Sequence, residues 1–217
     1  MISPEEFYNE SLKGKSTDQI MRVIRSLKRE IGRLKNIVEH PDYSPTMCPT
    51  ESTQIFCSKL YLEKAKLALL EIGETYTPTK AEQRAMAFDD NIPNISKVFF
   101  TIGGFFGGRE ERFYEVRENK IHAEYEHNLI FKTDDNIPAD EIKDIDKGEF
   151  LEQLKNLHIG EWRRNYDTLR FGYEVCDGAQ WELHIYFSNG HKPVKIYGDN
   201  AYPYNFDSVL ELFEIEK

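Results

Sequence analysis

The sequence has few cysteines and no long apolar run. Its 217 residues include three cysteines, Cys48, Cys57 and Cys176, whose spacing fits no zinc ligand set, so we expect reduced thiols. No apolar stretch approaches the roughly 18 to 20 residues of a membrane helix. The first residues, MISPEEFYNESLKGK, place acids where a signal peptide has its apolar core. We therefore expect a cytoplasmic protein with no membrane partner.

Positive charge is also scarce, because 28 Lys and Arg residues stand against 38 Asp and Glu residues and the formal net charge is -10. This balance argues against a protein built mainly to bind nucleic acid. The chain also lacks the G-K-[ST] and G-x-G-x-x-G phosphate motifs and any local cluster of nucleophile, base and oxyanion donor. We predict no cofactor and favour a protein that is not an enzyme, while an active site assembled from distant residues stays open.

The clearest fold signal runs from Cys176 to Phe213. Asn189-Gly190 separates two alternating apolar and polar runs and predicts a β-hairpin with a two-residue type I′ turn. This turn fixes a register, with the expected pairs Ile185 and Val194, Leu183 and Ile196, and Trp181 and Gly198. The register places Trp181, Leu183 and Ile185 on one buried face, where Gly198 leaves room for the indole. After Asn205, a helix presents one apolar stripe: Phe206, Val209, Leu210 and Phe213.

The N-terminal part predicts two long helices. Ser16 and Gln19 form a capping box, and the apolar residues that follow recur every three or four positions: Ile20, Ile24, Leu27, Ile31, Leu34 and Val38. Prolines interrupt residues 41–50, and a second helix is expected from about Ser52 to Ile72, with Leu60, Leu67 and Leu70 free to dock elsewhere. We predict an antiparallel helical hairpin over residues 1–76. Its stripe and basic residues suggest a homodimer through these helices.

Residues 77–217 predict a domain with an antiparallel sheet. Three strands are expected at Val98–Ile102, Arg112–Arg117 and Ile121–Tyr125, followed by an acidic loop over 134–146 and a helix capped by Asp146. A further strand is expected near 169–175. The predicted class is α+β: an antiparallel sheet packed by helices and preceded by the helical hairpin. Whether the front helices complete the core of one domain or fold separately stays open.

The run Asp177–Phe206 resembles a segment of uncharacterised bacterial proteins. The matching residues are a D-G-x-x-W strand, Asp177 to Trp181, and a G-x-N-A-Y-P stretch, Gly198 to Pro203, before a final helix. The resemblance supports the fold and implies a bacterial or phage protein. It implies no activity, substrate or cofactor.

Two strand regions carry candidate functional residues. Phe105 and Phe106 lie between glycine pairs. This spacing fits a hairpin loop better than a phosphate-binding loop, and an exposed tip would be a binding feature. On the third expected strand, His122, Glu124 and Glu126 alternate onto one face, a pattern that could bind a metal or pair a base with a carboxylate. A solvated polar face is the simpler interpretation, so we predict no metal site.

Two further groups are candidates for binding. Tyr202 and Tyr204 flank Pro203, which holds both rings extended and favours a surface site. On the first helix, a basic flank is formed by Arg22, Arg25, Arg29 and Arg33. Two simpler interpretations than nucleic-acid binding stay open: a solvated flank, or pairing with the acidic segment 134–152 of the same chain or of a second subunit.

These observations favour a non-catalytic protein that binds another bacterial or phage protein through the Phe105-Phe106 loop and the neighbouring sheet surface. The alternative is a metal-assisted hydrolase that uses His122, Glu124 and Glu126.

Overall fold

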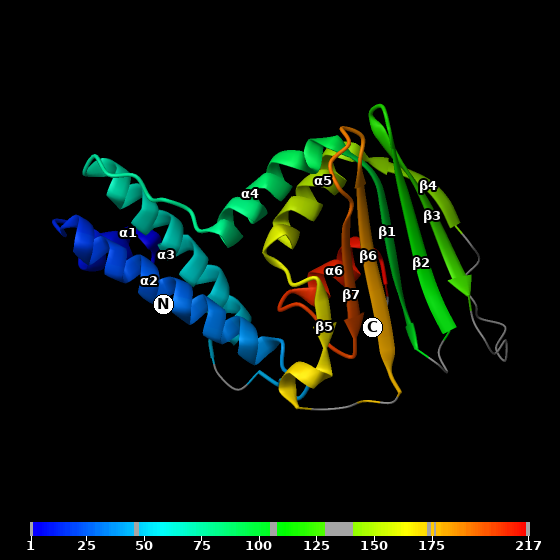
Figure 1. Cartoon of the computed structure of the whole chain (residues 1–217), viewed down its shortest axis with the longest axis horizontal. Coiled ribbons are helices and arrows are strands. Elements are labelled where there is room, and N and C mark those ends of the chain that lie inside the picture. The colour runs from blue at the N-terminus through cyan, green and yellow to red at the C-terminus, as the bar shows by residue number, and fades with distance from the viewer. Residues whose placement is uncertain are drawn as a thin grey trace. The chain divides into compact units, whose positions relative to one another are not determined.

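The computed structural model describes residues 2–45, 48–104, 108–128, 141–172, 175 and 177–215. The contacts within the chain divide it into two compact units, Met1–Thr79 (unit 1) and Lys80–Lys217 (unit 2). The predicted α+β class is confirmed, because helices precede a single mixed sheet (Figure 1). Among the described residues, no helix combines the length and the apolar composition that a membrane crossing requires.

Unit 1 is made of helices. α1 (Pro4–Phe7) and a short π-helix, η1 (Tyr8–Leu12), precede the long helices α2 (Thr17–Val38) and α3 (Glu51–Glu71). α2 starts at the predicted capping box, where the backbone N–H of Ser16 donates to Gln19 Oε1 at 2.9 Å. α2 and α3 lie side by side (Figure 1). Buried apolar side chains form the core of the unit: Leu12, Ile20, Ile24, Ile31, Leu62, Ala65, Ala68 and Leu69.

Apolar residues are distributed differently around α2 and α3. The stripe of α2 packs inside unit 1, because its residues Ile20, Ile24 and Ile31 belong to the buried core of that unit. α3 packs one side into the same core through Leu62, Ala65 and Leu69, whereas Ile72, just after the helix, is exposed. The opposite side of α3 leaves large side chains in solvent, with exposed fractions of 62 % for Phe56, 40 % for Leu60, 54 % for Leu67 and 62 % for Leu70. α3 therefore has a second apolar side that unit 1 does not cover.

Unit 2 is a sheet with helices on one face (Figure 1). Its helices are α4 (Lys80–Asn91), α5 (Lys147–Asn156) and α6 (Phe206–Leu212), with short 3-10 helices η2 (Ile92–Asn94), η3 (Ile159–Glu161) and η4 (Thr168–Phe171). Its strands are β1 (Ile95–Gly104), β2 (Gly108–Arg117), β3 (Lys120–Asn128), β4 (Glu141–Asp146), β5 (Asn165–Asp167), β6 (Ala179–Phe187) and β7 (Val194–Asp199). The described strands follow the order β4-β3-β2-β1-β6-β7-β5, antiparallel except for β5 with β7.

The sheet confirms one prediction from the middle of the chain and overturns two. β1, β2 and β3 form the predicted meander and are longer than expected. The predicted loop over 134–146 is wrong for residues 141–146, which form the edge strand β4 and pair with β3; residues 129–140 lie outside the described part of the chain. The predicted strand near 169–175 is wrong where the structure describes it. There, η4 begins after Asp167, whose side chain accepts a hydrogen bond from the N–H of Arg170 at 3.1 Å.

The β6–β7 hairpin keeps the predicted register but not the predicted turn. Ile185 pairs with Val194, and Trp181 pairs with Gly198. The turn is not type I′, because Gly190 has a φ of 77° whereas Asn189 keeps a negative φ. The strands end at Phe187 and start again at Val194, so the loop is wider than two residues. The alternating burial pattern, rather than the turn type, therefore determines which residues pair.

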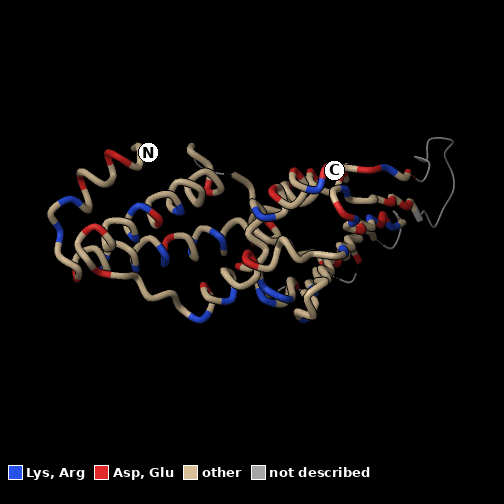
Figure 2. Tube along the Cα trace, turned by 90° about the horizontal axis from the view of Figure 1, so that it is seen from above, with Lys and Arg blue, Asp and Glu red and all other residues tan. Residues whose placement is uncertain are grey.

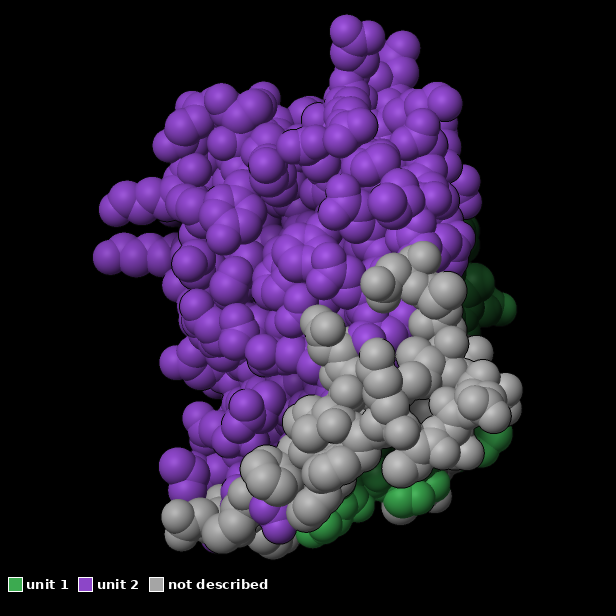
Figure 3. Space-filling view, turned by 90° about the vertical axis from the view of Figure 1, so that its right-hand side faces the viewer, with its two compact units in different colours: residues 1–79 green, residues 80–217 purple. Residues whose placement is uncertain are grey.

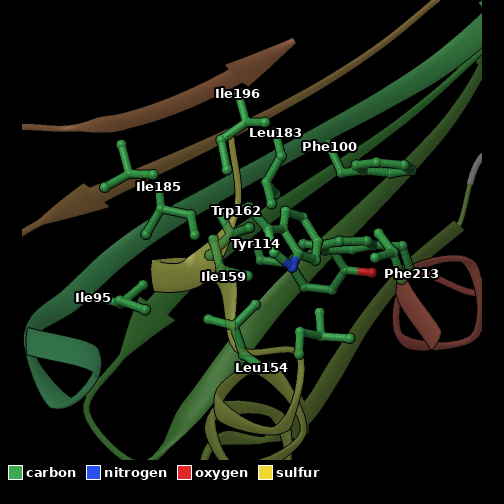
Figure 4. Packing of buried hydrophobic residues seen from close by; sticks show 14 of the residues in the cluster. Ile95, Phe100, Tyr114, Leu154, Ile159, Trp162, Leu183, Ile185, Ile196 and Phe213 are labelled. Atoms are coloured by element: carbon green, nitrogen blue, oxygen red, sulfur yellow. The ribbon is translucent and has the colours of Figure 1, made fainter. Parts of the chain in front are cut away.

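The core of unit 2 lies between the sheet and its helices, and Figure 4 shows its centre. Trp181 is fully buried, and its indole N–H donates to the carbonyl of Ala201 at 2.9 Å. A Cβ atom at Gly198 would overlap the Trp181 ring, so glycine is required there. Phe213, just after α6, stacks on Phe100 with ring centroids 4.5 Å apart. The final helix thus packs its predicted stripe onto the centre of the sheet.

A buried arginine joins β2 to the segment after α6. Arg112 is 2 % exposed, and its guanidinium lies over the ring of Tyr125, 4.6 Å from the ring centroid. Its Nε donates to the carbonyl of Phe213 at 3.0 Å. Its Nη2 donates to the carbonyl of Glu214 at 3.3 Å and to the carboxylate of Glu110 at 2.6 Å. Because the last carbonyls of a helix have no partner inside the helix, Arg112 supplies the donors that this end needs.

Candidate functional site

The second face of the sheet is the candidate site. α4, α5 and α6 cover one face, and no described helix covers the other, which we call the outer face (Figures 1 and 3). Because successive residues of a strand point to opposite faces, the residues that alternate with the core face outward. Acidic and basic residues are interleaved along these strands (Figure 2). A mainly charged face is the usual result for an antiparallel sheet with one side in water.

Aromatic side chains nevertheless cross the middle of the outer face. Phe113 of β2 lies opposite Phe99 of β1, with ring centroids 4.7 Å apart. His184 of β6 lies opposite Phe99 at 5.6 Å, and Tyr197 of β7 lies 5.5 Å from His184. We call Phe113, Phe99, His184 and Tyr197 the outer aromatic row. Phe113 and Tyr197 are 36 % and 41 % exposed, so the two ends of the row are open to solvent.

His184 is the polar member of the row and is mostly buried. Burial lowers the pKa of its imidazole, an effect that Lys195 adds to and Glu182 opposes. The Oε2 atom of Glu182 lies 3.3 Å from Nε2, but the geometry is not that of a hydrogen bond. Within the described residues, His184 Nε2 is therefore buried without a hydrogen-bond partner. The imidazole is held mainly by ring packing and favours its neutral form.

The structure brings together two of the three residues predicted as a metal or catalytic group. His122 Nε2 lies 3.3 Å from a carboxylate oxygen of Glu124, and His122 Nδ1 lies 3.3 Å from Asp144 of β4. The hydrogen bond from His122 lowers the pKa of Asp144. Glu126 faces Glu111 of β2 instead. In the described ranges, no three His, Cys, Asp or Glu side chains are placed to hold a metal ion.

Glu111 and Glu126 form an unusual pair on the outer face. They lie directly opposite each other on β2 and β3, a position in which like charges destabilise a sheet. Within the described residues neither carboxylate has an ion pair, whereas nearby Glu115 is bonded to Lys97 and Arg117, which lower its pKa. Two partly buried glutamates therefore lie opposite each other beside the exposed end of the aromatic row. A positive group from outside would relieve their repulsion.

The predicted Phe105-Phe106 loop lies outside the described residues. The strands that flank it are described, and Gly104 pairs with Gly108. A pocket of about 330 Å³ lies beside these glycines and is also lined by Arg109, Asp177 and Asn200. Asn200 Oδ1 accepts a hydrogen bond from the N–H of Ala179 at 2.9 Å. Asn200 therefore has a structural role here, because its side chain holds the turn after β7.

The predicted tyrosine pair is partly buried rather than a projecting surface feature. Tyr202 packs against Phe206 at 4.6 Å, and burial raises its pKa. Tyr204 also packs against the core of unit 2. Both rings thus cover the start of α6, and whether their exposed edges bind a partner stays a prediction.

All four arginines of the basic flank of α2 are exposed. Arg33 is bonded to Glu30 at 2.6 Å, which satisfies it within the helix. Arg22, Arg25 and Arg29 are exposed and form no ion pair with any residue that the structure describes. Three of the four arginines of the flank are therefore exposed without an ion pair to a described residue, and pairing with the acidic segment stays a prediction.

Comparison with known proteins adds no family assignment. No family model, no curated protein and no solved structure matches this chain. The resemblance of residues 177–206 to bacterial proteins therefore stays a prediction, as does a bacterial origin. The function has to be inferred from the site itself.

Sequence reasoning missed the outer aromatic row. Phe99 and Phe113 lie inside expected strands, where any phenylalanine suggests the core. The sequence signal that identifies these residues is the alternation of core and outward positions along a strand. Phe99 stands between Val98 and Phe100, both core residues, so it has to face outward. An aromatic residue at an outward strand position is the feature that would have found the site.

Proposed function

We propose that this protein is a non-catalytic interaction protein whose outer sheet face binds a partner protein. The partner contributes an apolar side chain that packs on Phe99 and Phe113, and a Lys or Arg side chain that binds Glu111 and Glu126. The single observation that carries the proposal is the position of Glu111 and Glu126 opposite each other and beside the exposed Phe113, with no ion pair to any residue that the structure describes.

The apolar part of the proposal rests on aromatic residues at outward positions. Aromatic residues are enriched where proteins meet, because they bury much area at a low entropic cost. Phe113 and Tyr197 are exposed at the two ends of a row whose middle is partly buried. The row is therefore a rigid platform, since Phe99 and His184 are already packed and need little ordering on binding.

The charged part rests on the repulsion between Glu111 and Glu126. In the free protein this contact is unfavourable, and a cation from the partner turns it into a favourable one. Charge complementarity of this kind mainly raises the association rate and specificity, and salt weakens it. A partner segment with an apolar residue next to a lysine or arginine matches both parts of the site.

The test begins with capture of partners from cells by the wild-type chain and ends with a purified partner. We expect Phe113→Ser to raise the Kd for that partner by about tenfold or more, the loss of one apolar contact residue at an interface. Glu111→Gln with Glu126→Gln is expected to weaken binding less and to flatten its salt dependence. Met86→Ser is the matched control, because Met86 is an exposed apolar residue of α4, away from the outer face.

The alternative function, a metal-assisted hydrolase, is favoured by the contact between His122 and Glu124. Metal analysis and thermal shifts across divalent ions, on the wild type and on His122→Ala, separate the two. A stoichiometric metal lost in His122→Ala overturns the interaction proposal. Binding of the purified partner that is unchanged in Phe113→Ser overturns it as well.

A further inference from the structure

α3 carries an apolar seam on the side that faces away from the core of unit 1. The outward residues are Phe56, Leu60, Glu63, Leu67 and Leu70, at successive spacings of four, three, four and three. This is the spacing of the contact residues in a pair of coiled helices. We call these five residues the α3 seam. Four are large and apolar, and the middle one is a carboxylate.

The seam is regular and is as large as the patches that proteins often use for binding. Its apolar members are 40 to 62 % exposed. Together they present roughly 400 Å² of apolar surface, which equals the largest patch on a typical monomer, and patches of that size are often functional. A helix with apolar residues on all sides is normally buried on all sides. α2 is the contrast, because it exposes arginines on its outward side.

We propose that the α3 seam binds the α3 seam of a second copy of this chain, with the two helices antiparallel and a two-fold axis at Glu63. The order of residues along the seam supports this pairing, because it is nearly symmetric about Glu63. Phe56 of one copy then lies opposite Leu70 of the other, and Leu60 meets Leu67 with an offset of one residue. Every apolar seam residue is covered by another, as an interface between identical surfaces requires.

The charges at the axis are compatible with this arrangement and fix its register. Glu63 is bonded to Lys66 of the same helix at 2.8 Å, so the axis brings together two neutralised pairs rather than two bare carboxylates. Each Glu63 also comes within reach of Lys66 of the second copy. Sliding one helix by a turn would place Glu63 against a leucine and bury its charge without a partner. A single polar residue in a seam sets register in this way, at some cost in stability.

The buried area indicates a dimer of moderate affinity. With the side-chain stems beside the seam, two copies would bury roughly 1,000 to 1,200 Å², the lower limit for a specific interface. We therefore expect a dimer that dissociates on dilution. This inference concerns unit 1 and does not depend on the proposed use of the outer sheet face.

Sedimentation of the full chain between about 1 and about 100 μM, where moderate interfaces dissociate, tests the proposal. The wild type is expected to pass from monomer to dimer over this range. Leu60→Gln with Leu67→Gln is expected to stay monomeric, a rise in Kd of about a hundredfold or more. Phe113→Ser is the control and keeps the dimer. Circular dichroism confirms that each variant is folded. A wild type that is monomeric throughout, or a dimer that the double variant leaves unchanged, overturns the proposal.

Cross-linking tests the antiparallel arrangement separately. In a chain whose native cysteines are replaced by serine, Glu63→Cys alone is expected to give a covalent dimer with a short bismaleimide, because a residue on the two-fold axis faces itself. Phe56→Cys alone is expected to give none, whereas a mixture of Phe56→Cys and Leu70→Cys chains links. Self-linking of Phe56→Cys indicates a parallel pair and overturns the arrangement. If the chain is monomeric and the cysteine at position 63 does not react with maleimide, the seam is covered within one chain, and the proposal is overturned.

Discussion

Replacing Arg112 with methionine tests whether this buried arginine stabilises unit 2. Methionine keeps most of the volume but removes the charge and the donors to the carbonyls of Phe213 and Glu214. Hydrogen bonds from a charged group contribute about 1.5 to 3 kcal/mol each. Glu110, the ionic partner, is about one third exposed and is rehydrated in the variant, so losing that pair adds little. We expect the free energy of unfolding to fall by about 3 kcal/mol.

Urea unfolding followed by tryptophan fluorescence measures this loss of stability in unit 2. Trp162 and Trp181 both belong to the core of unit 2, so the signal reports that unit alone. Glu110→Gln is the control, because it keeps an acceptor for Arg112 and is expected to cost about 1 kcal/mol. A loss below about 1 kcal/mol for Arg112→Met would mean that the cost of burying the guanidinium cancels its bonds, which would refute the reasoning.

Two further substitutions test the packing of the sheet. Gly198→Ala places a methyl group against the Trp181 ring and is expected to cost about 3 kcal/mol in urea unfolding; a cost that is not reduced in a Trp181→Phe background would contradict the clash. Burial lowers the pKa of His184 in the folded protein below its usual value of about 6.5. As the pH falls below about 6.5, the unfolded chain therefore takes up a proton before the folded chain does. The folded state loses stability from there down to the folded-state pKa of His184. The difference in unfolding free energy between wild type and His184→Gln should therefore shrink between pH 7 and pH 5, and a constant difference would contradict the effect of burial.

The sequence predicted the elements that carry strong local signals. The β6–β7 register, the meander and the packing of α6 follow from alternation and helical spacing, which depend on residues close in the chain. β4 was missed because an edge strand needs only backbone hydrogen bonds and can be mostly charged. β5 was missed because it has three residues and pairs with a distant strand. At the site, local spacing placed His122 beside Glu124 correctly, but Asp144 and Glu111 come from neighbouring strands, whose register no local pattern defines.

The position of β1 at the centre of the sheet has a consequence for how the chain is made. Its neighbours are β2, which follows directly, and β6, which ends at Phe187. At about 5 to 20 residues per second, β6 is complete roughly 4 to 17 s after β1. Until then, β1 has an unpaired edge, and its core side chains lack α6 and Phe213 to cover them. Unit 1 is already fully synthesised before this interval, whereas the half-made sheet is the species that a chaperone has to protect from aggregation.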